Sequence, residues 1–363
     1  MSIDRQTVDV REAKIAAFDN GHSAEMFVTV GADNIDAALM QLRAVCDAVV
    51  IDGNTSAFYD TYKDTLSSRP GNFELDGKLH FVSSSVTPGY LLSVMNLITK
   101  KKPGVIVFKT FGISEPELRT LTKDCVKKSK VRLGFFPEFM ECEVHACFPH
   151  SMPQEKMNEY SVRLNDVLRK YTYSYDRISL AERVSAVLAE DGLKLKIAES
   201  FTGGAIASAF TELSGASKFL TEALVTYTVS AKNKRLGVPL QVMAEKGVVS
   251  GDTVYDMANG LMASGDCDFV IATTGNAGPT AQSGAVGLCF IAIGAASAKE
   301  INVFRYVFDG DRDYNIKSGV KTALFLLYNF LLQNRQRMAA ARAQVQAAKQ
   351  QQQNPTAAGQ PTE

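Results

Sequence analysis

Short apolar runs and longer stretches of helical periodicity alternate along the first hundred residues of the chain. Apolar runs bounded by polar turns predict strands, and apolar positions three or four residues apart predict helices. The predicted strands are 24–31, 48–53, 79–84 and 104–109, and the predicted helices are 35–48, 59–66 and 89–102. Because strands and helices alternate, we expect residues 1–108 to form an α/β domain with a parallel sheet.

A shorter region with a different order of elements follows. Ser114 and Pro116 are typical of a helix start. Helical spacing predicts helices over 115–128 and 153–171, and two apolar runs between them predict strands over 131–136 and 139–148. We therefore expect residues 109–175 to form a small α+β domain. Its residues do not indicate a particular ligand.

Residues 176–335 again mix strands and helices and predict an α/β domain with a mixed sheet. The predicted strands are 194–198, 223–229, 269–274, 286–293 and 301–308, and the predicted helices are 179–190, 205–211, 230–237, 253–263 and 311–332. Residues 336–363 are rich in Ala and Gln and predict a frayed helix followed by a disordered tail. The chain as a whole is thus predicted to be a multi-domain α/β protein.

Composition narrows the classes of function. The 39 basic residues balance the 39 acidic ones in a chain of 363 residues, so no overall positive field attracts nucleic acid or an anionic membrane. No apolar run has the roughly 20 residues needed to cross a bilayer, and the N-terminus lacks the apolar core of a signal peptide. The six cysteines are scattered, which favours reduced thiols and a cytoplasmic location.

One stretch has the residue types of a metal site. Cys142, His145, Cys147 and His150 lie close together in the sequence. However, residues 139–148 are predicted to be a strand, and alternation puts Cys142 on one face with His145 and Cys147 on the other. Four ligands on opposite faces cannot converge on one tetrahedral ion. We therefore predict an ordinary half-buried strand and no metal site.

Ser200 lies where a predicted strand passes into a predicted helix, and the segment around it organises the third region. A hydroxyl there would face the unpaired N–H groups of the first helical turn and the positive end of the helix dipole. Gly203 and Gly204 lower helix stability, which suggests that a ligand or another element approaches this backbone closely. The alternative is a helix packed tightly on a sheet, with Ser200 as its N-cap.

Three further stretches of the third region carry candidate groups. Ser217 lies in a turn of small residues whose hydroxyl and amides can donate to an oxyanion or a phosphate, although a plain helix end explains it as well. Lys232 follows a predicted strand end, where a lysine is usually solvated. The segment 272–279 closes an apolar strand with glycines, and its N–H groups can form an anion-binding nest or an ordinary turn.

Serine hydrolysis needs a nucleophile, a base and donors to the developing oxyanion. The third region contains no histidine, because all four (His22, His80, His145 and His150) lie earlier in the chain. A buried lysine can replace histidine when burial lowers its pKa far enough for it to be neutral. Lys232 is the best-placed lysine, and the residues by themselves suggest a Ser–Lys pair without establishing it.

Several segments together resemble the C-terminal domain of the CinA (competence/damage-inducible protein A) family, the nicotinamide mononucleotide amidohydrolases. They lie in family order over about 155 residues, the size of one such domain. The matching segments are 198–204 (AESFTGG), 215–217 (GAS), 225–227 (VTY), 231–232 (AK), 236–238 (LGV), 274–279 (TGNAGP) and 308–312 (FDGDR). Each segment is short, but the ordered set is highly specific.

The resemblance implies a reaction and roles for particular residues. Ser200 would be the nucleophile, Lys232 its general base and Tyr227 a support for the proton relay, while Ser217 and Thr274 would hydrogen-bond near the reacting carbonyl. The implied reaction converts nicotinamide mononucleotide to nicotinic acid mononucleotide and ammonia and needs no metal or cofactor. The residues that would hold the nucleotide are Thr202, Gly203, Gly204, Gly275, Asn276, Gly278 and Arg312. Arg312 suits a phosphate, or equally a buried ion pair with Asp309 or Asp311.

The chain also departs from the family pattern. Phe201 stands where members often carry cysteine, and Asn276 where an aliphatic residue is usual. The family's first domain is of the molybdopterin-binding type, with a Gly-Gly-Leu-Gly-Pro-Thr loop and paired aspartates. Here residues 52–64 read DGNTSAFYDTYKD, so residues 1–108 are predicted to be a degenerate form without pyrophosphatase activity. Residues 109–118 (KTFGISEPEL) match the family's middle domain better.

Two hypotheses of different class follow. The first is an amidohydrolase of pyridine nucleotide salvage, with a small nucleotide as substrate. The second is a nucleotide-binding or scaffold protein of the same fold that has lost turnover. Nucleic-acid or membrane partners find no support in the balanced charge. We expect a homo-oligomer, whose subunit number the sequence does not give.

Overall fold

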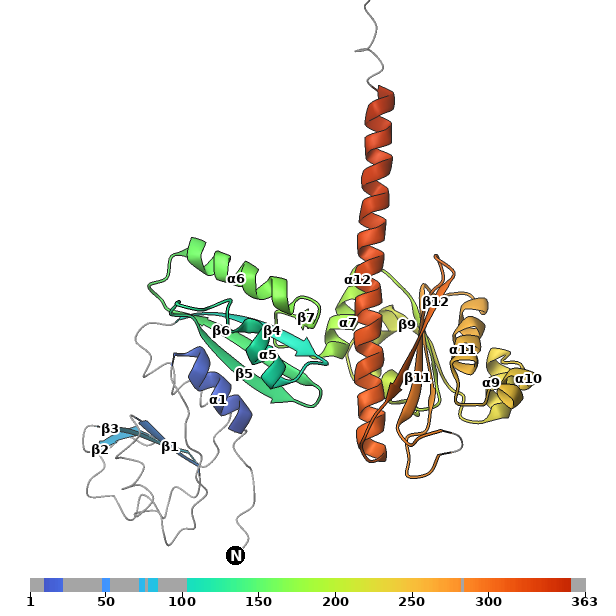
Figure 1. Cartoon of the computed structure of the whole chain (residues 1–363), viewed down its shortest axis with the longest axis horizontal. Coiled ribbons are helices and arrows are strands. Elements are labelled where there is room, and N and C mark those ends of the chain that lie inside the picture. Colours follow the sequence, from blue (N-terminus) through green and yellow to red (C-terminus); the bar gives the residue numbers. More distant parts are fainter. Residues whose placement is uncertain are drawn as a thin grey trace, which may run out of the picture. The chain divides into compact units, whose positions relative to one another are not determined.

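The computed structural model describes residues 10–21, 48–52, 72–75, 78–83, 103–281 and 284–353. The chain forms two compact units, residues 1–175 and 176–363 (Figure 1). The boundary between the two units falls where the sequence predicts the start of the C-terminal domain. The finer division into three domains and a tail stays a prediction.

The first unit begins with a small sheet. Its strands are β1 (Ala48–Asp52), β2 (Asn72–Leu75) and β3 (Lys78–Ser83), in the order β1-β3-β2. β1 and β3 are parallel, as predicted, and both agree with the predicted ranges to within one or two residues. β2 is antiparallel to β3 and was not predicted. The predicted elements 24–31, 59–66 and 89–102 lie outside the described residues, as does the predicted helix 35–48 except for Ala48, which begins β1.

The second sheet of this unit has four strands in the order β5-β6-β4-β7, and all of its pairs are antiparallel. The strands are β4 (Gly104–Phe111), β5 (Arg132–Glu138), β6 (Glu141–Phe148) and β7 (Thr172–Ser174). β4 crosses the predicted boundary at 108/109. The sequence pattern assigned it to the first α/β layer, but its pairing with β6 places it in this sheet.

One face of this sheet is covered by α5 (Glu115–Thr122) and α6 (Gln154–Leu168), both shorter than predicted. Alternate residues of β6 point to these helices and join the apolar core: Cys142, Val144, Ala146 and Phe148. The predicted alternation is therefore correct. The prediction of a half-buried strand is wrong, however, because all eight residues of β6 are buried.

The second face of β6 is covered by α1 (Val10–Asp19), and the contact between them is polar. The buried ring of His145 lies between two carboxylates, with Nδ1 2.7 Å from Asp19 and Nε2 2.9 Å from Glu143. Arg11 of α1 donates to Glu143 at 2.7 Å. Among the described residues, no group of three or more His, Cys, Asp or Glu side chains is placed to hold a metal ion. His145 therefore joins α1 to the sheet through ionic hydrogen bonds.

The second unit is built on one five-stranded sheet in the order β12-β11-β10-β8-β9. The strands are β8 (Leu195–Glu199), β9 (Leu220–Val225), β10 (Phe269–Gly275), β11 (Leu288–Ala295) and β12 (Glu300–Val307). β8 is parallel to both of its neighbours, β9 and β10, whereas the pairs β10–β11 and β11–β12 are antiparallel. The predicted mixed sheet is confirmed.

Helices cover both faces of this sheet (Figure 1). One face carries α9 (Val229–Leu236), α10 (Leu240–Glu245) and α11 (Gly251–Ala263), and alternate strand residues such as Ala198 and Ala272 pack against them. The other face carries α7 (Leu180–Glu190), α8 (Ala205–Thr211) and α12 (Arg312–Gln353). There the ring of Phe269 packs edge-on against Phe330 of α12. Each strand side chain therefore faces either α9, α10 and α11 or α7, α8 and α12.

The last helix is longer than its pattern predicts. The apolar periodicity ends near Leu332, but α12 continues through the Ala- and Gln-rich segment to Gln353, since both residue types favour helix. Residues 354–363 of the predicted tail lie outside the described residues. In the described part of the chain, no helix has both the length and the apolar character that crossing a membrane requires.

The His145 pairing generates a prediction about pH. Burial lowers the pKa of His145, but its hydrogen bonds to Asp19 and Glu143 outweigh this and raise the pKa above its ordinary 6.5. A raised native pKa means that the pairing stabilises fully below pH 6.5 and is lost as pH rises through the native value. His145→Asn should lower the free energy of unfolding by about 2–4 kcal/mol at pH 6.

The measurement is urea unfolding of the full chain from pH 6 to pH 9, followed by circular dichroism. The difference between wild type and His145→Asn should shrink as pH rises. His150→Asn is the matched control, because His150 is exposed. A difference that stays constant across the range would contradict the prediction.

Candidate active site

The carboxyl ends of the parallel strands β8, β9 and β10 bring the principal candidates together. Ser200 follows β8 directly and is 8% exposed, and Lys232 of α9 is fully buried. The Lys232 Nζ atom lies 2.9 Å from Ser200 Oγ and donates to the backbone carbonyl of Thr226 at 2.8 Å. The structure therefore makes a Ser–Lys pair from two residues that are 32 positions apart in the sequence.

Local structure explains how a lysine comes to be buried here. The Thr228 hydroxyl accepts a hydrogen bond from the N–H of Ala231 at 3.1 Å and caps α9. Lys232 follows in the first turn, on the face turned to the sheet, where Leu236 is also buried. Burial lowers the pKa of Lys232 to about 8, since the charged ammonium loses its hydration. A substantial fraction of the amine is therefore neutral in mildly alkaline solution and can accept a proton.

The amino end of α8 does not serve Ser200, which corrects the sequence-based expectation. The buried carboxylate of Glu199 accepts hydrogen bonds from the N–H groups of Gly204, Ile206 and Ala207 at 2.9, 3.1 and 2.9 Å. These are the groups that were expected to face the nucleophile. The alternative, Ser200 as N-cap, is also wrong, because Gly204 holds that position.

The two glycines after Ser200 have a conformational role. Their φ angles are +63° at Gly203 and +102° at Gly204, in the left-handed region that side chains disfavour. A Cβ atom at Gly203 would meet nothing within 4 Å, and one at Gly204 only the Val225 side chain at 3.5 Å. Among the described residues, no other element approaches the Cβ positions of these two glycines closely. The glycines instead let the backbone turn sharply from β8 into α8.

Two neighbouring threonines of β10 have different roles. The sequence indicated Thr274, whose hydroxyl donates to the Val248 carbonyl at 3.0 Å. Thr273, which sequence reasoning missed, lies 2.9 Å from the Thr202 hydroxyl and accepts a longer hydrogen bond, 3.4 Å, from the N–H of Ser200. Thr202 is thus buried and bonded within the protein. Alternation along a strand predicts that Thr273 and Thr274 point to opposite faces of the sheet. Only the register of β8 against β10 shows which of the two contacts the Ser200 backbone.

Phe201 is accommodated by two glycines. A Cβ atom on Gly275 would lie 2.4 Å from the Phe201 ring, and one on Gly319 of α12 would lie 2.7 Å from it. Phe201 is buried and packs toward α12, whereas Ser200 points to α9. The aromatic residue at this position therefore fills the α12 side of the sheet. Gly275, predicted to bind substrate, provides space for this ring.

The loop after β10 is held by its own hydrogen bonds. The buried Asn276 side chain donates to the Ala285 carbonyl at 3.4 Å, and its backbone carbonyl accepts from Gly287 at 2.7 Å. Asn315 of α12 donates to the Ala277 carbonyl at 3.0 Å. These contacts give Asn276 a role in organising the loop. Its predicted contact with substrate stays a prediction.

Arg312 and Tyr227 meet at an exposed edge of the site. The Arg312 guanidinium donates to the Gly278 carbonyl at 2.8 Å and to the Tyr227 hydroxyl at 3.4 Å. The ion pair with Asp309 or Asp311 is not formed in the described structure, and the Asp311 side chain instead accepts from the N–H of Tyr314 at 2.8 Å. No hydrogen bond joins Tyr227 to Lys232 in this described part of the chain. Arg312 thus bridges the segment after β9 and the loop after β10.

Ser217 is not brought to Ser200 within one chain. It lies in the short turn Ala216–Lys218, just before β9, and is exposed. Ser200 follows the parallel strand β8, so the two serines lie at opposite ends of the sheet. The five residues of β8 alone span about 16 Å, at about 3.3 Å per residue. A hydrogen bond from Ser217 to a carbonyl at Ser200 of the same chain is excluded by this distance.

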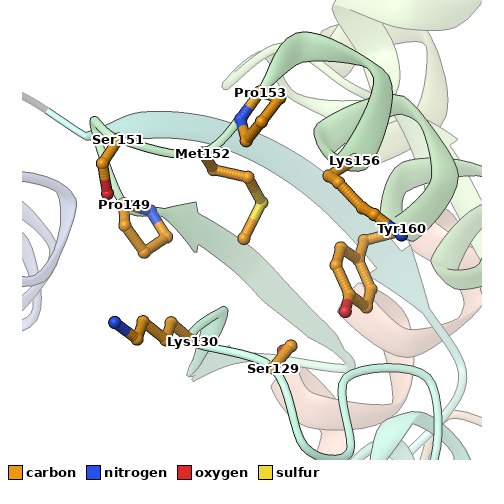
Figure 2. Close-up of a pocket in the computed structure, with 8 residues that line it drawn as sticks. All are labelled: Ser129, Lys130, Pro149, Ser151, Met152, Pro153, Lys156 and Tyr160. Atoms are coloured by element: carbon orange, nitrogen blue, oxygen red, sulfur yellow. The ribbon is translucent and has the colours of Figure 1, made fainter.

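A separate shallow cleft of about 210 Å³ lies in the first unit, beside the amino end of α6 (Figure 2). Its lining residues are Ser129, Lys130, Pro149, Ser151, Met152, Pro153, Lys156 and Tyr160. In Figure 2 the Met152 side chain projects between Pro149 and Tyr160. None of these residues belongs to the Ser200 site.

The second unit is thus an α/β domain with a buried Ser–Lys pair at the carboxyl edge of its sheet. A family model described as the CinA C-terminal domain matches residues 177–331, so this part of the chain is similar to that domain. A CinA-like protein of Syntrophus aciditrophicus is 34% identical over 62% of this chain and 54% of its own length. A CinA-like protein of Geobacter sp. (strain M21) is 32% identical over 62% of this chain and 55% of its own length.

Solved structures also match this unit. The competence/damage inducible protein CihA from Agrobacterium tumefaciens is 36% identical over 41% of this chain and 91% of its own, with a TM-score of 0.39. The chain spans about half the length of the curated relatives it matches.

The burial of Lys232 generates a prediction about stability. The native pKa of about 8 lies below the ordinary 10.5, so the unfolded state binds more protons between these values and wild-type stability rises with pH across them. Lys232→Met removes the buried amine. It should raise the free energy of unfolding by about 1–3 kcal/mol at pH 7 and by less at pH 10.

Urea titrations of the full chain at the two pH values measure this difference. Lys234→Met is the matched control, because Lys234 lies in the same helix but is exposed. A Lys232→Met protein that is less stable than wild type at pH 7 would show that the amine stabilises the fold.

Proposed function

We propose that this protein hydrolyses the carboxamide of nicotinamide mononucleotide to nicotinic acid mononucleotide and ammonia. The observation that carries the proposal is the buried Lys232 amine, 2.9 Å from the Ser200 hydroxyl. A hydroxyl beside an amine of lowered pKa is the arrangement that Ser–Lys nucleophilic catalysis requires. The similarity of residues 177–331 to the CinA C-terminal domain supports the same class of reaction.

The chemistry follows from the positions of the two groups. Neutral Lys232 accepts the Ser200 hydroxyl proton as Oγ bonds to the amide carbon. The resulting ammonium returns a proton to the amide nitrogen, the C–N bond breaks and ammonia leaves. Water then attacks the acyl ester and gives its proton to Lys232, which passes it to Ser200 Oγ as the ester bond breaks. Each step uses the same base, so a single lysine is sufficient.

The substrate class is supported by the exposed edge of the site. The Arg312 guanidinium is exposed and, in the described structure, forms no ion pair, so it retains charge for a phosphate. Its two partners, Gly278 and Tyr227, lie on segments that follow β10 and β9, whose carboxyl ends flank Ser200. A mononucleotide with its phosphate on Arg312 would extend from this edge toward the nucleophile.

A second candidate is a nucleotide-binding or scaffold protein without turnover. It is favoured by Asn276, which stands where an aliphatic residue is usual in the family and whose side chain donates to the Ala285 carbonyl. This candidate predicts tight binding of the mononucleotide without ammonia release. The two functions therefore differ in one measurable product.

The direct test is ammonia release by the purified full chain from a panel of pyridine nucleotides and free nicotinamide. Nicotinamide mononucleotide should be hydrolysed, and Ser200→Ala should reduce the rate by at least about 10³-fold while binding is retained. Calorimetric titration of Ser200→Ala with the mononucleotide measures that binding. Wild-type protein that binds the nucleotide but releases no ammonia from pH 6 to pH 10 would support the scaffold function instead.

The pH dependence of the rate tests the role of Lys232. A general base acts in its neutral form, so kcat/KM should rise with pH and level off above the Lys232 pKa of about 8. Lys232→Ala should lose this rise together with most of the activity. A kcat/KM that depends on Ser200 but is flat from pH 6 to pH 10 would exclude Lys232 as the base.

A further inference from the structure

Thr226 occupies the position beside Ser200 in the neighbouring strand. β8 and β9 are parallel, and Ala198 pairs with Leu224 and Glu199 with Val225. The paired residues of the two strands end there, but the Thr226 N–H donates to the Glu199 carbonyl at 2.8 Å, so the same register continues and sets Thr226 opposite Ser200. Register partners project to the same face of a sheet at a spacing of about 4.8 Å between strands. The Thr226 side chain therefore belongs to the Ser200 side of the sheet.

The backbone N–H and carbonyl of Thr226 are both hydrogen-bonded, but its hydroxyl has no partner among the described residues. Its carbonyl accepts the hydrogen bond from Lys232 Nζ, so the residue touches the proposed base directly. Thr226 is 1% exposed, and its Oγ1 atom has no hydrogen-bond partner among the described residues. A buried hydroxyl without a partner costs about 1–3 kcal/mol, which a valine of the same shape would avoid. The hydroxyl is thus unfavourable for stability at this point.

On the basis of the proposed function, we propose that the Thr226 hydroxyl positions the water molecule that hydrolyses the acyl-enzyme. This water has to lie within reach of Lys232, which takes its proton, and of the ester carbon on Ser200. Thr226 adjoins both residues. The water donates its proton to Lys232, its oxygen bonds to the ester carbon, and the bond from that carbon to Ser200 Oγ breaks. Thr226 acts as a positioning residue, since it holds the water and exchanges no proton.

This role separates the two halves of the reaction. Acylation needs Ser200 and Lys232, whereas deacylation also needs the water in place. Thr226→Val keeps the shape and removes the hydroxyl, so it should slow deacylation by about 10- to 100-fold, the scale of effect expected when a reacting group loses its alignment. Ammonia should then appear in a burst equal to the enzyme concentration, followed by a slow phase.

The experiment follows ammonia release from nicotinamide mononucleotide by the full chain on a rapid timescale, with acid quench and intact-mass analysis for the acyl-enzyme. Thr226→Val should accumulate the acyl form, and Thr226→Ser, which restores a hydroxyl, should not. Thr322→Val is the matched control, because Thr322 of α12 is also buried with an unpartnered Oγ1 atom but lies on the other face of the sheet. It should behave as wild type. The melting temperature of each variant shows that it is folded.

The outcomes are distinct. A burst with an accumulated acyl-enzyme in Thr226→Val alone supports the inference. Wild-type turnover in Thr226→Val, or a change in KM without a change in kcat, overturns the inference and leaves the proposed function intact. A wild-type protein that releases no ammonia overturns the proposed function and this inference with it.

Discussion

The second unit depends on one costly feature, a lysine whose amine is completely buried. A charged ammonium in an apolar interior loses several kcal/mol of hydration, so the fold has to hold the amine partly neutral and give its N–H groups partners. Lys232 finds two partners, the Thr226 carbonyl and the Ser200 hydroxyl. Both lie at the carboxyl edge of the sheet. Backbone groups just past the ends of the parallel strands are not paired within the sheet there, and ligand sites of α/β sheets lie at this edge. The buried amine therefore fixes where Ser200 must lie.

The hydrogen bonds of Glu199 also affect the charge of Lys232. This buried carboxylate is adjacent in sequence to Ser200, and an ion pair between it and Lys232 would raise the pKa of the lysine and keep it charged. The Glu199 carboxylate instead accepts hydrogen bonds from three backbone N–H groups at the start of α8. The two opposite charges are thus satisfied separately. The amino end of α8 therefore binds the Glu199 carboxylate, and Glu199 forms no ion pair with Lys232 in the described structure.

The sequence predicted what depends on local pattern and missed what depends on packing. The strands of the second unit and its mixed sheet follow from periodicity, and Ser200 and Lys232 follow from their positions after strands. The burial of Lys232 could not be predicted, since it depends on how α9 lies against β8 and β9. The sequence indicated Thr274 instead of Thr273, because adjacent strand residues point to opposite faces and the sequence does not show which face contacts the Ser200 backbone. The burial of β6 was missed because its second face is covered by α1, more than 120 residues earlier.

The parallel register places three hydroxyl residues in one row across the sheet. Thr274 follows the pair Ala272 and Ala198 in β10, just as Thr226 follows the pair Leu224 and Ala198 in β9, and Ser200 lies between them. Their hydroxyls have three different states. Thr274 is bonded to the Val248 carbonyl, Ser200 to Lys232, and Thr226 has no partner among the described residues. The unsatisfied member of the row is the one beside Lys232, which is where the proposed hydrolysis of an ester on Ser200 would need a water molecule.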